Sequence, residues 1–224
     1  MVPPRVVELR TALILAIVCA ITPVNAFADW LIAAYVGASH TAATTLHIIP
    51  DAGASFTLPT VHFVGEAWKS PIYYGYRVAW QRKNAPLGIE AEFTHAKTIA
   101  LETGATTLTH FEQSHGLNFV LGNVTYRGPT FLEGRCVAVG RAGAGVTIPH
   151  VEATYLGNSV SSYQFGGPAV QIGAGLEVTV HGGITAIVDG RVTYTTVSDA
   201  LAGAMLSASF TTWHLAVGAG WRFR

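Results

Sequence analysis

The stretch F-T-T-W-H-L-A-V-G-A-G-W-R-F-R, residues 210–224, alternates between two kinds of side chain with a period of two. One parity is apolar and ends in aromatic residues: Trp213, Leu215, Val217, Ala219, Trp221 and Phe223. The other parity is small or polar: His214, Ala216, Gly218, Gly220 and Arg222. Successive side chains of a β-strand point to opposite faces of the sheet, so each set occupies one face. An apolar outer face with a polar inner face is typical of a transmembrane β-barrel.

The composition favours a membrane barrel and excludes other classes of protein. Charged residues make up 12% of the chain, about half the usual share of roughly 25%. No segment after residue 28 has the ~18 consecutive apolar residues that a transmembrane helix needs. The formal net charge is zero, and the sequence has no basic cluster of the kind that nucleic-acid binding needs. Cys136 is the one cysteine after residue 28, which excludes an intramolecular disulfide in the processed chain.

The first residues have the pattern of a secretory signal peptide. Arg5 and Arg10 are basic, residues 12–21 are apolar, and A-F-A at residues 26–28 is a cleavage site of the A-x-A kind. We therefore expect a signal peptide over residues 1–28 and a single barrel domain over residues 29–224.

Eight segments have the length of about ten residues that a tilted membrane strand needs. The expected strands are residues 30–39, 72–82, 87–98, 115–127, 134–148, 167–180, 184–197 and 210–224. The connections after the second, fourth and sixth strands are short and the others are longer, as in barrels with short periplasmic turns and longer outer loops. An even number of strands closes the sheet without an edge. The sequence thus predicts an all-β fold, an eight-stranded antiparallel up-and-down transmembrane barrel, monomeric, in the bacterial outer membrane.

The inward parity of these strands carries charges that balance in sign. The inward cations are Arg77, Arg135, Arg141 and Arg191, and the inward anions are Glu90, Glu92, Glu177 and Asp189. The lumen of an eight-stranded barrel has room only for side chains, and unpaired charges there are costly. We therefore expect a paired network that plugs the lumen, which argues against a narrow channel.

Three histidine motifs fall at the outer ends of neighbouring strands. They are F-T-H-A-K at residues 93–97, S-H-G-L-N at 114–118 and I-P-H-V-E at 148–152. The three motifs should meet at one patch of the outer rim, with Glu92, Glu152 and Asn118 near the imidazoles. Imidazoles titrate near neutral pH and bind metals, so the patch could hold a divalent metal or act as general acid and base. The alternative is that these are interfacial histidines bonded to loop backbone or to lipid headgroups.

Two family resemblances follow from these motifs. The spacing Gly218-x-x-Trp221-x-Phe223 resembles the C-terminal signal of bacterial outer-membrane barrels, from which Arg224 departs because such chains usually stop at the aromatic residue. The three histidine motifs, with P-I-Y-Y-G at residues 71–75 and Y-Q-F-G-G-P-A at 163–169, resemble the lipid A oxidase-like family of small outer-membrane barrels. This second resemblance covers roughly residues 29–180, and the last two strands share only the barrel pattern.

The second resemblance implies an oxygen-dependent oxidation of the proximal glucosamine of lipid A to an aminogluconate unit. Outer-membrane lipid and lipid A are then the expected partners, and molecular oxygen is the co-substrate. On the matching motifs, the candidate catalytic residues are His95, His115, Asn118, His150 and Glu152. Lys97 is the candidate for binding lipid A phosphate, and the candidate ligands of a divalent metal are His95, His115 and His150. The competing interpretation is a non-enzymatic barrel, resembling the membrane domain of outer-membrane protein A, with a structural, adhesion or partner-binding role.

Overall fold

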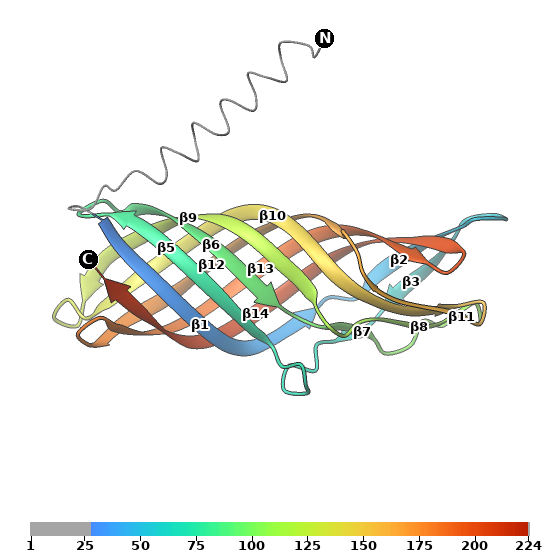
Figure 1. Ribbon diagram of the computed structural model, residues 1–224, viewed down its shortest axis with the longest axis horizontal. Coiled ribbons are helices and arrows are strands. Elements are labelled where there is room, and N and C mark those ends of the chain that lie inside the picture. Colours follow the sequence, from blue (N-terminus) through green and yellow to red (C-terminus); the bar gives the residue numbers. More distant parts are fainter. Residues whose placement is uncertain (1–27, 224) are drawn as a thin grey trace, which may run out of the picture.

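The protein forms a β-barrel in the computed structural model, which describes residues 28–223 (Figure 1). The expected signal peptide and Arg224 lie outside these residues, except that Ala28 begins the first strand. Eight long strands build the wall: β1 (Ala28–Thr41), β5 (Tyr74–Arg82), β6 (Leu87–His95), β9 (Leu117–Phe131), β10 (Cys136–Tyr155), β12 (Gly167–His181), β13 (Ile184–Leu201) and β14 (Ala204–Phe223). Over residues 28–223, no helix is long and apolar enough to cross a membrane.

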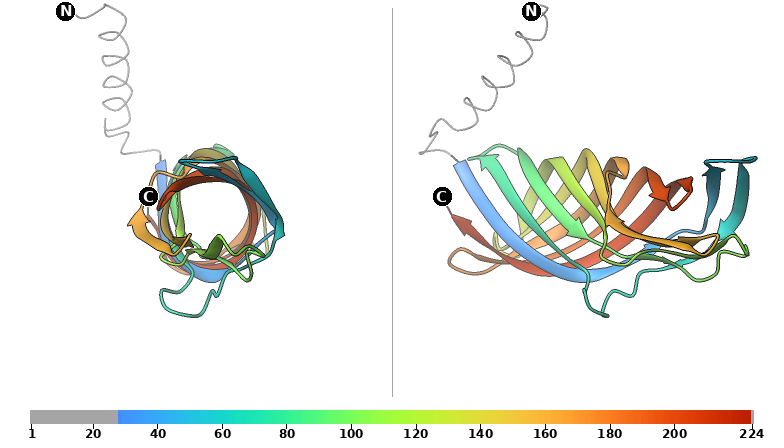
Figure 2. Two further views of the ribbon diagram at one scale, coloured as in Figure 1. Left: turned by 90° about the vertical axis from the view of Figure 1, so that its right-hand side faces the viewer. Right: turned by 45° about the vertical axis from the view of Figure 1, so that its right-hand side comes forward.

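The sheet closes on itself. The eight strands follow the order β12-β13-β14-β1-β5-β6-β9-β10, and β10 pairs with β12 to complete the ring. First and last strands are neighbours, paired from Trp30↔Phe223 to Thr41↔Thr212. All of these pairings are antiparallel, and Figure 2 shows the closed wall seen along the barrel. Each wall strand therefore has two hydrogen-bonded neighbours, which is the condition for a sheet to cross a membrane.

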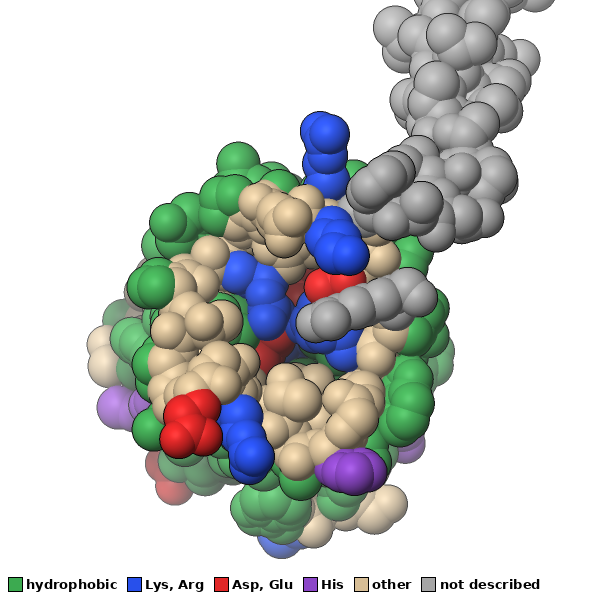
Figure 3. All heavy atoms as spheres, turned by 90° about the vertical axis from the view of Figure 1, so that its left-hand side faces the viewer, with side chains coloured by type: hydrophobic (Ala, Val, Ile, Leu, Met, Phe, Trp, Pro, Cys, Tyr) green, Lys and Arg blue, Asp and Glu red, His purple; other side chains and the backbone are tan. Residues whose placement is uncertain are grey.

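The strands segregate side chains as the alternation predicts. On β14, Trp213, Leu215, Val217, Trp221 and Phe223 are exposed on the outside, whereas His214 and Ala216 are buried inside. Seen from the end where β1 begins and β14 ends, charged side chains gather at the centre and hydrophobic side chains ring the outside (Figure 3). The apolar exterior is the surface that lipid covers in a membrane barrel.

Six shorter strands extend the barrel at the end opposite the start of β1. They are β2 (Thr44–Pro50), β3 (Phe56–Val61), β4 (Phe63–Val64), β7 (Thr98–Ala100), β8 (Leu108–Gln113) and β11 (Asn158–Tyr163). β2 pairs with β14, while β8 and β11 pair with the end of β10. Apolar side chains from these strands and from the wall form one buried core, which includes Leu46, Ile48, Leu108, Phe111 and Phe210. The outer segments therefore form an apolar cap over the lumen.

The strand prediction is confirmed for all eight wall strands, but several ends differ. The loop expected after residue 197 is instead a continuation of the β13–β14 hairpin, paired as far as Leu201↔Ala204. The strands continue because Val197, Leu201 and Leu206 keep the inward parity and are buried in the apolar cap.

The prediction that Arg135 points into the lumen is wrong. Leu132, Glu133 and Gly134 all have positive φ and form a turn, in which the Arg135 amide donates to the carbonyl of Leu132. β10 consequently begins only at Cys136, and the Arg135 side chain is exposed. The alternation of side chains does not show where a strand begins. Arg135 precedes the start of β10, so its side chain belongs to neither face of the sheet.

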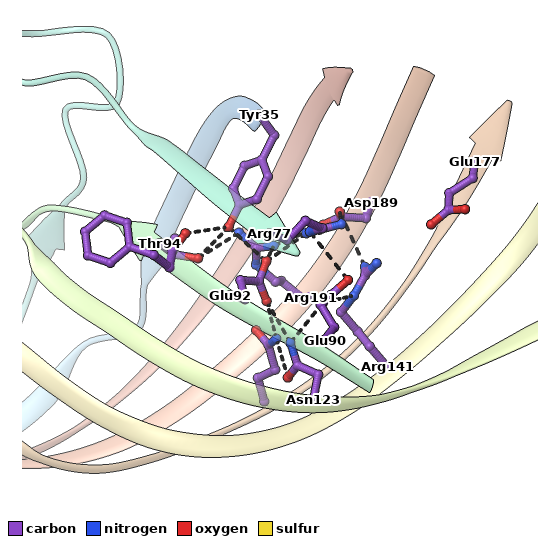
Figure 4. A network of polar contacts seen from close by, with 12 residues as sticks. Tyr35, Arg77, Glu90, Glu92, Thr94, Asn123, Arg141, Glu177, Asp189 and Arg191 are labelled. Atoms are coloured by element: carbon purple, nitrogen blue, oxygen red, sulfur yellow. Dashed lines mark hydrogen bonds and ion pairs between the residues drawn. The ribbon is translucent and has the colours of Figure 1, made fainter. Parts of the chain in front are cut away.

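Six of the other seven predicted lumen charges form a connected network of ion pairs, and Glu177 lies apart from it (Figure 4). The network consists of three arginines and three carboxylates: Arg77, Arg141, Arg191, Glu90, Glu92 and Asp189. Glu92 accepts from Arg77 at 2.8 Å and from Arg191 at 2.6 Å, and Arg77 also donates to Asp189 at 2.7 Å. These side chains are almost completely buried, so the network fills the lumen as the balance of charges predicts.

Glu92 is also the residue on which uncharged donors converge. It accepts from the hydroxyl of Tyr35 at 2.9 Å and from the amides of Asn123 at 3.1 Å and Gln171 at 2.5 Å. Towards the end where β1 begins, Glu177 accepts from Arg127 and Arg222. The lumen is thus polar at its centre and at this mouth, and apolar beneath the cap.

Replacing Glu92 with alanine should lower the free energy of unfolding by about 3–5 kcal/mol, the range for breaking a buried ion pair from one side. The cost arises because Arg77 and Arg191 would stay buried after losing a shared carboxylate. Urea unfolding of the protein folded in lipid vesicles measures it. Lys83→Gln, in the exposed turn between β5 and β6, is the matched control. A loss for Glu92→Ala no larger than that of the control would contradict the assigned role of the network.

Candidate functional site

The three histidine motifs meet at the outer rim. His95 ends β6, His115 lies in the turn between β8 and β9, and His150 lies on β10. Two backbone hydrogen bonds join these segments: the His150 amide donates to the carbonyl of Gly116 at 3.0 Å, and the Leu117 amide donates to that of Ala96 at 2.6 Å. The convergence predicted from the order of the strands is therefore present in the fold.

Gly116 is required for this convergence. Its φ of 102° lies in a region that other residues rarely adopt. A Cβ atom there would come within 2.4 Å of Asn118 Oδ1 and 2.9 Å of His95 Cδ2. The glycine of the S-H-G-L-N motif thus lets the turn pack against the imidazole of His95.

Two imidazoles and one carboxylate form the centre of the site. His115 Nδ1 lies 3.0 Å from Glu152 Oε1, and His150 Nδ1 lies 3.3 Å from the same oxygen. The two imidazole rings are 4.7 Å apart between centroids. One ligand atom from each of the three side chains lies within 4.8 Å of the others. The side chain of His115 is 55% exposed and that of His150 is 14% exposed, so the group opens toward the surface.

The carboxylate of Glu152 is held by its neighbours. Ser114 Oγ donates to Glu152 Oε1 at 2.6 Å. Glu152 lies on the part of β10 that pairs with β8 and β11, beyond the membrane-spanning wall. The hydrogen bond from Ser114, followed by the contact with His115, lowers the pKa of Glu152 below its ordinary value. The side chain is therefore ionised at neutral pH and can act as a metal ligand or a hydrogen-bond acceptor.

His95 lies beside this group and is not part of it. Its ring stacks on Tyr74 with 5.0 Å between centroids and packs against Gly116. Its Nδ1 is buried and has no hydrogen-bond partner among residues 28–223. The converging ligand atoms come from His115, His150 and Glu152, whereas the sequence suggested His95 as the third ligand.

Asn118 and Lys97 both bind backbone carbonyls. Asn118 Nδ2 donates to the carbonyls of Ile148 at 3.0 Å and His115 at 3.3 Å, so this side chain shapes the turn that carries His115. Lys97 is only 5% exposed, and its Nζ donates to the carbonyls of Lys69 at 3.0 Å and Ser70 at 3.3 Å. The ammonium expected to meet lipid phosphate therefore has partners within the protein.

The sequence gave no role to two residues that support the site, and it gave Glu92 two locations of which one is right. Ser114 lies in the S-H-G-L-N motif. Its hydrogen bond to Glu152 depends on the turn between β8 and β9, which the alternation of side chains does not predict. Tyr163 pairs in register with His150 and packs edge-on against its ring at 4.6 Å. Glu92 was expected both among the inward lumen charges and near the imidazoles, and it belongs to the lumen network, as its inward parity predicts.

No protein-family model matches the chain, and no curated protein matches it. Several solved structures are similar to it, among them the following three. Neisserial surface protein A shows 11% identity over 88% of this chain and 99% of its own, with a TM-score of 0.46. The outer membrane protein AlkL in DMPC lipid bilayers shows 14% identity over 88% and 91%, with a TM-score of 0.49. Ail, the attachment invasion locus protein of Yersinia pestis, shows 17% identity over 88% and 99%, with a TM-score of 0.37.

The class of the protein follows from its own architecture. The wall is closed, its outer face is apolar, and its lumen is filled by paired charges. The protein is a small bacterial outer-membrane β-barrel with an elaborated outer rim, where a cluster of histidines surrounds a carboxylate.

Ser114→Ala should raise the pKa of Glu152 toward its ordinary value, because the ionised form loses its main hydrogen bond. A depressed pKa stabilises the fold above the pKa of the unfolded chain, and that stability is lost as pH falls through the folded pKa. Ser114→Ala should therefore reduce the stability that the ionised Glu152 adds to the fold at neutral pH. Carboxyl-carbon NMR titration in detergent micelles measures the pKa. Ser161→Ala, which removes the exposed hydroxyl paired in register with Glu152, is the control and should leave the pKa unchanged. Equal titration curves for both variants would contradict the assignment.

Proposed function

We propose that this barrel is a lipid A-modifying oxidoreductase whose active site is the group formed by His115, His150 and Glu152 at the outer rim. The observation that carries the proposal is the convergence of two imidazoles and one carboxylate within 4.8 Å. Two histidines and one carboxylate are the donor set of non-haem iron(II) enzymes that use molecular oxygen. The resemblance of the surrounding motifs to lipid A oxidase-like barrels points to the same chemistry.

The position of the group fits a substrate held in the outer leaflet. Along the outer face of β10, the exposed Ile148 is followed by His150 and then by Glu152, all of one parity. This face passes from apolar to ionisable over a few residues, as a surface does where the hydrocarbon of a membrane meets its headgroups. Tyr163 and Phe165 are exposed nearby. The acyl chains of lipid A could stay beside the apolar wall while its sugar reaches the imidazoles.

The proposed reaction is a two-electron oxidation at C1 of a proximal glucosamine that carries a free hydroxyl at C1. The C1–H bond breaks, the hydroxyl at C1 loses its proton, and two electrons pass to molecular oxygen, which leaves as hydrogen peroxide. Water then opens the resulting lactone to the aminogluconate, so the sugar gains one oxygen atom in total. A divalent metal held by this donor set would supply a binding place for oxygen and a Lewis acid for the sugar hydroxyl.

The protein groups have separate tasks in this scheme. His115, His150 and Glu152 would bind the metal, and Ser114 orients the carboxylate. His95 is the imidazole left over for proton transfer, because it packs against the turn that carries His115 and its Nδ1 has no partner among the described residues.

The first test measures lipid A itself. Cells that express the protein should contain lipid A heavier by one oxygen atom, and His150→Ala should abolish this product because the site loses a donor. Mass spectrometry of extracted lipid A reads the result. His181→Ala, at the exposed end of β12, is the control. Each variant must first show heat-modifiable barrel folding. If lipid A is unchanged although the wild-type protein is folded in the membrane, the enzymatic proposal fails and the non-enzymatic barrel stands.

The second test measures metal binding without turnover. Titration of the folded protein with cobalt(II), followed by visible absorption, should show one site that is lost in His150→Ala. Ser114→Ala should weaken binding by about 10-fold to 100-fold, the usual effect of removing a group that orients a ligand. Ser161→Ala should bind as the wild type does. Undiminished binding by His150→Ala would contradict the assigned donor set.

A further inference from the structure

One loop projects sideways from the wall at the level of the histidine cluster. It consists of residues 65–71, between β4 and β5, and is hereafter the side loop. Figures 1 and 2 show it leaving the barrel surface where β5 begins. The Lys69 amide donates to the carbonyl of Glu66 at 3.0 Å, and the Tyr73 amide donates to that of Ala67 at 2.7 Å. The side loop is therefore a closed turn with a defined shape.

The tip of the side loop presents an aromatic residue beside a cation. Trp68 is 68% exposed, and the side chain of Lys69 is 73% exposed. The side loop joins the lipid-facing wall directly, because Ile72 and Tyr76 follow it and are exposed. Tryptophan beside lysine or arginine is the combination that anchors membrane proteins at the headgroup layer.

Lys97 fixes the side loop to the active-site region. Its ammonium is buried and donates to the carbonyls of Lys69 and Ser70, the residues next to Trp68. A buried ammonium is tolerated only where its donors are satisfied, so these bonds hold the side loop in place. Lys97 follows His95 by two residues, and His95 in turn stacks on Tyr74 at the start of β5. The side loop and the histidine cluster therefore share one rigid frame.

We propose that the side loop is a lipid-binding arm: Trp68 lies in the headgroup layer and Lys69 binds a phosphate of lipid A beside the site. This inference rests on the proposed function for the identity of the lipid. In the present structure the ammonium of Lys69 pairs with Glu66 at the exposed surface. Exposed pairs of this kind are worth little, whereas a phosphate offers several strong acceptor oxygens. Lys97 acts as a positioning residue, and Lys69 takes the phosphate-binding role expected for Lys97.

The location of Trp68 can be measured by fluorescence in vesicles. The reporter keeps Trp68 and replaces the other tryptophans with phenylalanine: Trp30, Trp80, Trp213 and Trp221. Lipids brominated near the headgroup should quench its emission, because an interfacial indole lies at the depth of the bromine atoms, and aqueous iodide should have little effect. Strong quenching by iodide without quenching by bromolipid would overturn the arm. If the reporter does not fold, the emission of Trp68 and its quenching are obtained by subtracting the spectra of Trp68→Phe from those of the wild type.

A matched reporter calibrates this measurement. Leu156→Trp, made in a reporter that carries Trp68→Phe, places an indole in the exposed turn between β10 and β11, beyond the wall. Iodide should quench this indole and bromolipid should not.

Recognition of phosphate is tested with the Trp68 reporter. Adding lipid A to phospholipid vesicles should shift its emission to shorter wavelength, and dephosphorylated lipid A should not. Lys69→Gln should lose the shift, and Lys83→Gln, at the opposite end of the barrel, should keep it. Lys97→Met should lose the shift and also increase quenching by iodide, because the side loop is released. An equal shift with soluble glucosamine phosphate would show a general anion site and overturn the assignment to a lipid.

These readings are independent of catalysis. An arm that binds lipid A while no oxidised lipid A forms would refute the proposed function and leave the arm intact. If Trp68→Phe and Lys69→Gln form as much oxidised lipid A as the wild type, the lipid-binding arm is refuted and the proposed function is unaffected.

Discussion

The pairing of β1 with β14 is the interaction on which the rest of the structure depends. Within hydrocarbon, backbone amides and carbonyls have no water to bind, so every strand needs a neighbour on each side. Closure with eight strands leaves a lumen that only side chains can fill. Any charge placed there must find an opposite charge there too. The salt-bridge network around Glu92 is thus a consequence of closure, and it gives the wall a rigid interior.

The same closure gives the histidine cluster a firm support. β10 runs from Cys136 to Tyr155 without interruption, paired first with β9 and β12 and then with β8 and β11. His150 and Glu152 lie on the part of this strand that has just left the wall. The turn that carries His115 is docked on the same strand by the bond from the His150 amide to the Gly116 carbonyl. Side chains held by strands keep a more precise geometry than side chains held by loops.

Alternation was enough to predict the wall, the facing of its strands and most of the lumen charges, because a strand has only two faces. Strand order was enough to bring the three histidine motifs to one region. Contacts set by loop conformation were not predictable in this way. The inward turn of Lys97, the hydrogen bond from Ser114 to Glu152 and the exposure of Arg135 all depend on turns with positive φ or on cap packing. Parity also gives no height along the barrel, so it could not separate the polar lumen from the apolar cap.

The height of the cluster on the wall is itself constrained. Ionisable groups deep in the membrane are costly, so imidazoles and a carboxylate cannot lie far below the headgroups. Placed on the tips of β2 and β3, the same groups would be out of reach of a lipid sugar. The outer face of β10 satisfies both limits, since Ile148 is apolar and Glu152, four residues further along the same face, is ionised. Tyr74 covers His95 and Tyr163 covers His150 with rings that tolerate both lipid and water. The proposed lipid chemistry would therefore be restricted to a narrow band of a barrel of this size, between these two limits, and this is the band in which the proposal places the histidine cluster.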